Sequence, residues 1–171
     1  ISEAPNSFAK TLRGKIAPTD EENGAGLRAV VGERALPADI VERLRNGSIR
    51  RIRVIGQGTA AVAGQSTAAI LDHLVEADLD VDAITATELS GFHMALDMSD
   101  TLAIAVSQSG TTTDTNRTVD LLRARGAAVI GIVNRRNSDL TDKADGVLYT
   151  SDGRDVEMSV ASTKAFYAQV A

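Results

Sequence analysis

Short apolar runs alternate with longer amphipathic segments from residue 51 onward. Five of these runs have the length, and most of them the β-branched content, of buried strands. They are Arg51–Ile55, Val81–Ala86, Leu102–Val106, Ala127–Val133 and Val147–Thr150. Strand and helix patterns that alternate at this spacing are typical of a parallel sheet covered on both faces. We therefore predict an α/β fold, a three-layer α-β-α sandwich with a five-stranded parallel sheet.

The segments between these runs carry apolar residues at helical spacing, often with a suitable residue at one end. Ser138 is suited to begin a helix as an N-cap, and Gly126 is suited to end one. The acidic, glycine-bearing stretch Pro18–Gly26 predicts a loop. Helices are predicted over Asn6–Arg13, Pro37–Leu44, Thr59–Ala77, Phe92–Leu96, Asp114–Arg125, Ser138–Ala144 and from about Val160 to the end.

The loops that follow the predicted strands should meet in space. Right-handed crossovers place the carboxyl ends of parallel strands along one edge of the sheet, where ligands of open α/β folds bind. The loops expected to converge there are Gly56–Ala60, Thr87–Ser90, Ser107–Thr113 and Ser151–Ser162.

The most specific candidate site is the loop Ser107–Thr113, which reads S-Q-S-G-T-T-T. It carries five hydroxyl side chains in seven residues, and no positive charge follows until Arg117. A loop between a strand and a helix presents free backbone N–H groups and the positive end of the helix dipole to an anion. Capping alone would use one or two of these hydroxyls. We expect this loop to hold the phosphate of a small ligand; an ornate turn without a ligand is the alternative.

The turn Gly56–Ala61 reads G-Q-G-T-A-A and fits the dinucleotide pattern G-x-G-x-x-G/A. A dinucleotide site would also need an acidic residue near the end of the next strand to bind the ribose, and Glu88 lies near that place. Two other interpretations remain open. The turn either needs glycine for backbone reasons alone, or it forms one wall of a smaller ligand pocket.

Other polar residues give weaker signals. Lys164 opens the last helix and either reaches a ligand or is solvated. His73 and His93 lie apart from any cysteine or metal-ligand spacing, so no metal and no cofactor is expected. The acidic residues near the carboxyl edge, as candidate general bases, are Glu88, Asp114, Asp155 and Glu157.

The composition of the chain excludes some classes of partner and of chemistry. The chain of 171 residues is long enough for one substantial core, and its formal net charge of −5 argues against nucleic acid or an anionic membrane as the main partner. Cysteine is absent, which excludes disulfides and thiolate chemistry. There is no apolar run of membrane-spanning length and no signal peptide, so we expect a cytoplasmic protein. The chain begins without methionine and stops inside a predicted helix, so we expect a piece of a longer protein.

Two motifs together resemble the sugar isomerase (SIS) family. Residues 107–115 read S-Q-S-G-x-T-x-D-T and residues 160–166 read V-A-S-T-K-A-F. These motifs, with the lead-in E-A-P-N at residues 3–6 and L-R-G-K-I at residues 12–16, are most similar to the isomerase halves of the glucosamine–fructose-6-phosphate aminotransferases. The resemblance covers nearly the whole chain and implies a SIS fold, which is flavodoxin-like or Rossmann-like. By it, residues 1–25 are a linker and residues 26–171 a single phosphosugar-binding domain, the first lobe of a longer protein.

The resemblance also implies a set of substrate-binding residues. The family's phosphate loop matches Ser107–Thr112, its first turn matches residues 57–60, and its sugar-contacting segment matches Val160–Ser162. Two positions depart from the family pattern: Ala60 stands where the family has serine, and Thr111 where it usually has glutamate. The implied binding residues are Thr59, Ser107, Gln108, Ser109, Thr112, Val160 and Ser162.

The family's reaction makes glucosamine 6-phosphate from fructose 6-phosphate and glutamine. Its acid–base glutamate, ring-opening histidine and Schiff-base lysine belong mainly to the second lobe, so no catalytic residue is expected in this chain, Lys164 included. The implied partners are a sugar phosphate, the second SIS lobe, a glutaminase domain and a second copy in a homodimer. Two alternatives remain: a non-catalytic phosphosugar sensor of a regulator, and a dinucleotide-binding domain.

Overall fold

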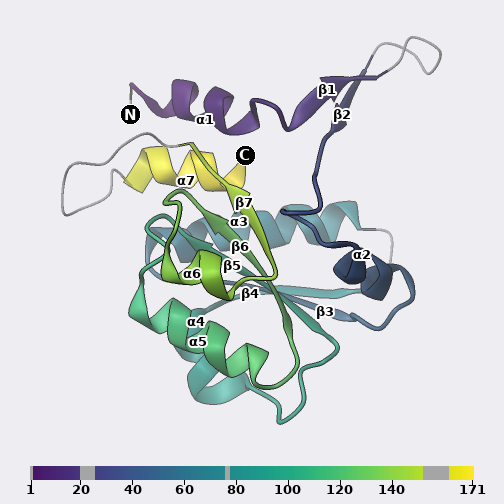
Figure 1. The fold of residues 1–171 in the computed structure, drawn as a ribbon. Coiled ribbons are helices and arrows are strands. Elements are labelled where there is room, and N and C mark those ends of the chain that lie inside the picture. Colours follow the sequence, from purple (N-terminus) through teal and green to yellow (C-terminus); the bar gives the residue numbers. More distant parts are fainter. Residues whose placement is uncertain (1, 20–25, 76–77, 152–161) are drawn as a thin grey trace.

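A five-stranded parallel sheet forms the centre of the protein (Figure 1). The computed structural model describes residues 2–19, 26–75, 78–151 and 162–171. The strands are β3 (Arg51–Gly56), β4 (Asp80–Thr85), β5 (Thr101–Ser107), β6 (Ala128–Val133) and β7 (Gly146–Tyr149). Their order across the sheet is β4-β3-β5-β6-β7, so the predicted α/β fold with five parallel strands is confirmed.

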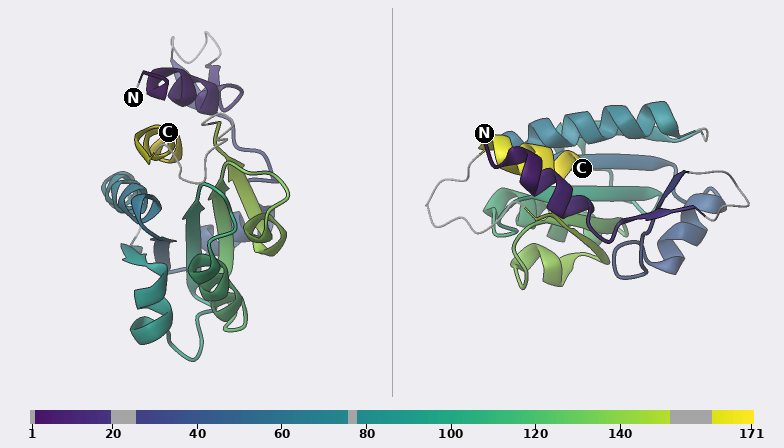
Figure 2. Two further views of the ribbon diagram at one scale, coloured as in Figure 1. Left: turned by 90° about the vertical axis from the view of Figure 1, so that its left-hand side faces the viewer. Right: turned by 90° about the horizontal axis from the view of Figure 1, so that it is seen from above.

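Helices cover both faces of this sheet (Figure 2). On one face lie α2 (Ala38–Arg45), α3 (Thr59–Leu74) and α7 (Ser162–Val170). On the other lie α4 (Ala86–Glu88), a π-helical turn η2 (Leu89–His93), α5 (Thr113–Arg123) and α6 (Asp139–Lys143). Because the two faces bury separate apolar clusters, the central strands β5 and β6 are buried on both sides.

Strand β5 shows how the sequence meets this demand. Leu102 and Val106 point into the cluster beneath α3 and α7, while Ala103 and Ala105 point into the cluster beneath α5. Successive strand residues face opposite sides, so a strand that is covered on both sides has to be continuously apolar. The short apolar runs of the sequence have this origin.

Two of the predicted helices differ from the structure by three residues or more at a boundary, whereas the other described helix boundaries agree to within two residues. The helix expected over Phe92–Leu96 lies earlier, in α4 and η2, because the Thr85 side chain caps a helix directly after β4 by accepting from Glu88 N–H. Phe92 and Leu96 are 84% and 96% exposed, so their apolar character does not mark a buried helix face. Helix α3 ends at Leu74, short of Ala77, since Val75 is already extended.

The lead-in contributes a helix and a small hairpin. Helix α1 (Ala4–Leu12) lies across α7, and a two-stranded antiparallel sheet, β1 (Ile16–Pro18) with β2 (Leu27–Ala29), extends from its end (Figures 1 and 2). The sequence did not predict these three-residue strands. In the described part of the chain, no helix is both long and apolar enough to span a membrane.

The strand order places a switch point between β3 and β5. The chain leaves β3 for β4 on one side and later returns to β5 on the other, so the connections that follow β3 and β5 diverge. The crevice outside the carboxyl ends of two such strands is where open α/β sheets bind ligands.

Candidate functional site

A pocket of about 190 Å3 lies at this switch point. It is lined by residues from the turn after β3, the loop after β5 and the last helix. They are Gln57, Thr59, Ala60, Val106, Ser107, Gln108, Ser109, Thr112, Ala165 and Gln169. The structure therefore brings together five of the predicted binding residues, and the predicted convergence of the loops after β3 and β5 is confirmed.

The loop after β5 is fixed by one glycine. Gly110 has φ +67°, and a Cβ atom there would overlap Ser138 Oγ and approach Val133 Cγ2 to 3.0 Å. Its backbone is also fully engaged. The Gly110 N–H donates to Ser107 Oγ (3.0 Å), and its carbonyl accepts from Leu140 N–H and Asn116 Nδ2 (both 3.0 Å). These bonds anchor the middle of the loop to Ser107, to α5 and to α6.

The hydroxyl groups of this loop have two different roles. Ser107 is 3% exposed, and its oxygen shapes the loop through the bond to Gly110. Ser109 Oγ accepts from both the backbone N–H (3.2 Å) and the hydroxyl (3.1 Å) of Thr111. The Ser109 hydroxyl proton remains available to donate, as does that of Thr112, whose side chain makes no capping bond to α5.

The amino end of α5 faces the same loop. Its first helical hydrogen bond runs from Asn116 N–H to Thr112 O (3.0 Å), so the N–H groups of residues 113–115 have no carbonyl of α5 behind them. Buried Asn116 also donates from Nδ2 to Thr112 O (3.1 Å), which ties the loop to the helix. Free donors at the positive end of a helix dipole favour an anion.

The turn after β3 is tight for backbone reasons. A Cβ on Gly56 would come within 2.9–3.0 Å of the Ala60 and Ala61 backbone, so only glycine fits there. Gln57 Nε2 donates to Thr87 Oγ1 (3.0 Å), which joins this turn to the region after β4. Glu88 lines a different pocket, together with Arg51 and Arg53. The acidic partner that a dinucleotide site would need is therefore absent from the described lining of the switch-point pocket.

The last helix supplies a wall of the pocket, though not through the residues that the sequence singled out. Val160 lies outside the described residues, and Ser162 is the first residue of α7. Lys164 is neither solvated nor in the pocket lining: it is 6% exposed and pairs with Glu3 of the lead-in (3.3 Å). The residues of α7 that line the pocket are Ala165 and Gln169.

Sequence analysis missed Gln169. It lies one turn after Ala165 and beside the buried Ala168, so it belongs to the buried face of α7. The signal that could have revealed it is its spacing, four residues after Ala165 and therefore on the same side of the helix.

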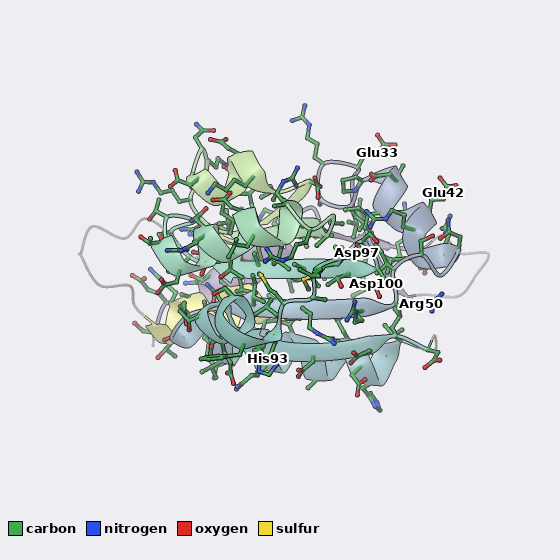
Figure 3. The ribbon with its side chains drawn as sticks, turned by 90° about the horizontal axis from the view of Figure 1, so that it is seen from below. Glu33, Glu42, Arg50, His93, Asp97 and Asp100 are labelled. Carbon is green, nitrogen blue, oxygen red and sulfur yellow. The ribbon has the colours of Figure 1, made fainter. Side chains whose placement is uncertain are left out.

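Charged groups gather away from this pocket, since none of its described lining residues is charged. Figure 3 shows Asp97, Asp100 and Arg50 together at one end of the strands, with His93 apart from them. The Arg51 side chain, which bonds Asp100 at 2.6 Å, holds the pKa of that carboxyl below its usual value. Hydrogen bonding from Arg53 likewise lowers the pKa of Asp80.

Neither of the two described acidic residues that were candidate general bases lines the switch-point pocket. Asp114 is exposed in the first turn of α5, and Glu88 lines the separate pocket that contains Arg51. The other two candidates, Asp155 and Glu157, lie outside the described residues. Among the described residues, no three His, Asp or Glu side chains are grouped to hold a metal ion. The described part of the pocket therefore offers hydrogen-bond donors and acceptors and no group for proton transfer near neutral pH.

Known proteins match both the sequence and this fold. The SIS domain family matches residues 48–171. A glutamine–fructose-6-phosphate aminotransferase (isomerizing) from Streptomyces coelicolor is 34% identical over 170 residues, 99% of this chain and 25% of the relative. The chain thus spans about a quarter of the length of that relative.

Two solved structures share the fold at lower sequence identity. The C-terminal domain of a glucosamine-fructose-6-phosphate aminotransferase from Francisella tularensis has a TM-score of 0.70 at 17% identity, over 99% of this chain and 43% of that one. The Vibrio vulnificus NanR protein, solved with ManNAc-6P, has a TM-score of 0.64 at 19% identity, over 99% of this chain and 57% of that one.

Proposed function

This chain belongs to the SIS domain family, and on that premise we propose that its switch-point pocket binds a sugar phosphate. The observation that carries the proposal is the loop Ser107–Thr112, which lines the pocket with three hydroxyl side chains and leads directly into the first N–H groups of α5. A dianionic phosphate accepts hydrogen bonds from such donors, and the helix dipole favours its charge. In this proposal Thr59, Ser107, Gln108, Ser109 and Thr112 surround the ligand, with Val160 and Ser162 completing the set.

We further propose that the chain, with residues 26–171 as one domain after a linker, acts as a lobe of a glutamine-dependent fructose-6-phosphate aminotransferase. The 34% identity over nearly the whole chain supports this assignment. The ligand would then be fructose 6-phosphate or glucosamine 6-phosphate, in the cytoplasm. A second SIS lobe, a glutaminase domain and a second copy in a homodimer would be the partners. Because the described pocket lacks a titratable side chain, this chain alone would bind the sugar without converting it.

A second candidate function is that of a phosphosugar sensor. The absence of charged side chains from the described pocket lining favours it, because a sensor needs binding without chemistry. The fold also matches NanR, which was solved with a phosphosugar. Sequencing the gene on both sides of this chain separates the two functions: a second SIS lobe indicates the enzyme, and a DNA-binding segment indicates the regulator.

Calorimetric titration tests the shared part of both functions. We expect fructose 6-phosphate or glucosamine 6-phosphate to bind, and fructose and NADH not to bind. Replacing Ser109 and Thr112 together by alanine should weaken binding about 100-fold, because each loses a hydrogen bond to a charged group, worth about 1.5 kcal/mol. Thr113→Ala is the matched control, since its exposed side chain does not line the pocket. The proposal would be overturned if NADH bound and neither phosphosugar did.

A further inference from the structure

Gln169 buries a polar atom that the fold does not use. Gln169 is 5% exposed, and its Oε1 has no hydrogen-bond partner among the residues that the structure describes. Among the described side chains that bury a polar atom in this way, Gln169 is the one that lines the switch-point pocket. A buried acceptor without a partner destabilises a protein, so each such group calls for an explanation.

The buried neighbours of Gln169 on α7 do not supply this partner. Ala165 and Ala168 are 3% and 1% exposed and have no polar side-chain atom, and the buried Lys164 pairs with Glu3 of the lead-in. A methionine or leucine at position 169 would satisfy this buried face of α7 at lower free energy than an amide with no partner. Among the described residues nothing offsets the cost of burying this amide oxygen, so its partner lies outside them.

The chemistry of the amide oxygen identifies which part of the ligand it meets. A phosphate dianion carries only acceptors, so it gains nothing from another oxygen acceptor. The loop after β5 and the amino end of α5 already supply donors for such a group. A carbonyl-type oxygen needs a donor, which a sugar hydroxyl provides. The terminal torsion of a glutamine is soft, so the amide turns toward the pocket at little cost.

We infer that Gln169 is a specificity-determining residue that accepts a hydrogen bond from a hydroxyl group of the bound sugar, while the loop after β5 holds the phosphate. This inference rests on the proposed function and deepens it. It divides the pocket into a phosphate part and a hydroxyl part, and it makes α7 the element that distinguishes a sugar phosphate from other phosphate esters.

The test compares two ligands on three proteins. The ligands are fructose 6-phosphate and monobutyl phosphate, which has the ester but no hydroxyl groups on its carbon chain. The proteins are the wild type, Gln169→Met and Gln65→Met, the last being a matched control on the exposed side of α3. We expect Gln169→Met to weaken fructose 6-phosphate binding about tenfold and to leave monobutyl phosphate within twofold. Gln65→Met should change neither.

Thermal unfolding without ligand gives an independent readout. If Gln169 serves the ligand, Gln169→Met should melt at the same temperature as the wild type or up to about 3 °C higher, because the substitution removes an unpartnered buried acceptor. A structural role predicts the opposite sign. Both measurements are repeated on Gln169→Leu. Because leucine has a different shape, this variant separates the loss of the amide from poor packing of the methionine side chain.

Each other outcome overturns a definite claim. If Gln169→Met and Gln169→Leu weaken the binding of both ligands equally, or change the binding of neither, the role of Gln169 is overturned. The proposed phosphosugar pocket is not affected by that result. A lower melting temperature in both variants makes Gln169 a structural residue. If wild-type protein binds neither ligand, the proposed function fails, and this inference fails with it.

Discussion

The two edges of the central sheet use polar groups in opposite ways. At the amino edge, Arg51 pairs with Asp100 (2.6 Å) and Arg53 pairs with Asp80, so the charges there compensate one another and tie neighbouring strands together. At the carboxyl edge, the described lining of the pocket is neutral, and within the described part of the chain the Thr112 side chain makes no capping bond to α5. The amino edge pairs its charged groups with one another, whereas the described carboxyl edge carries uncharged donors and acceptors.

The direction of the helices explains this difference. Helices α3, α4 and α5 begin soon after β3, β4 and β5, so their amino ends and the positive ends of their dipoles lie at the carboxyl edge. An anion is favoured there without any lysine or arginine. The carboxyl ends of helices point back toward the amino edge, where the arginines of β3 lie. The same architecture therefore places cations at one edge and favours anions at the other.

The largest expected effect comes from disturbing the loop of the carboxyl edge that Gly110 anchors. Gly110→Ala should lower the free energy of unfolding by about 3 kcal/mol, because a left-handed φ and an overlap with Ser138 add. Phosphosugar binding should be lost as well. Urea denaturation measures the first effect and calorimetry the second.

Gly47→Ala is the matched control for this change. Gly47 has φ +74°, but a Cβ there meets no atom within 4 Å, so only the backbone cost of about 1 kcal/mol is expected. Equal losses in the two variants would show that the packing against Ser138 does not hold the loop.

A smaller effect is expected at the amino edge. Asp100→Asn should lower the free energy of unfolding by no more than about 1 kcal/mol at pH 7, because this ion pair is partly exposed. The Arg51 hydrogen bond lowers the pKa of Asp100 in the folded protein. Its stabilisation is therefore present above the unfolded pKa, near 4, and is lost as the pH falls through the lower folded pKa.

Urea denaturation of wild type and Asp100→Asn across this pH range checks the sign. The two curves should differ near neutrality and converge in strong acid, while the phosphosugar affinity stays unchanged. A difference in stability that persists at low pH, or a loss of ligand affinity, would show that the two edges are not independent.

The smallest effect concerns the pH dependence of binding. Since no described lining residue titrates between pH 5 and 8, the affinity should follow the phosphate of the ligand, whose second pKa is about 6. We expect a decrease of a few-fold between pH 7.5 and 5.5 in calorimetric titrations. An inflection of affinity well away from pH 6 would point to a titrating protein group in the site.

The sequence predicted those parts of the protein that depend on local pattern. The central strands β5 and β6 are buried along their length, so the sequence shows them as continuous apolar runs, whereas the edge strand β4 alternates exposed and partly buried residues at its start. The hydroxyl-rich loop after β5 is predicted because its composition exceeds what capping uses. Thr59 and Gln108 also line the pocket as the family resemblance implied. Whether these residues bind a phosphosugar stays a prediction.

The parts that depend on tertiary packing were not predictable. Lys164 appeared to be solvated or ligand-binding, because its burial under the lead-in depends on α1 lying across α7. Gln169 is not predicted as a site residue, because the burial of its Oε1 without a described partner depends on how α7 packs. Phe92 and Leu96 have the spacing of a buried helix face, but both are exposed. The strands of the hairpin have three residues each, which is too short to show a strand pattern in the sequence.

Amide chemical shifts during a titration with fructose 6-phosphate test the central claim most directly. The account predicts perturbed N–H signals in residues 107–115, at the loop and the first turn of α5. The signals of residues 80–82 and 100–102, at the amino edge, should stay unchanged. Shifts confined to the amino edge, or no shifts at millimolar ligand, would contradict the claim that the carboxyl edge is built to hold an anion without cations.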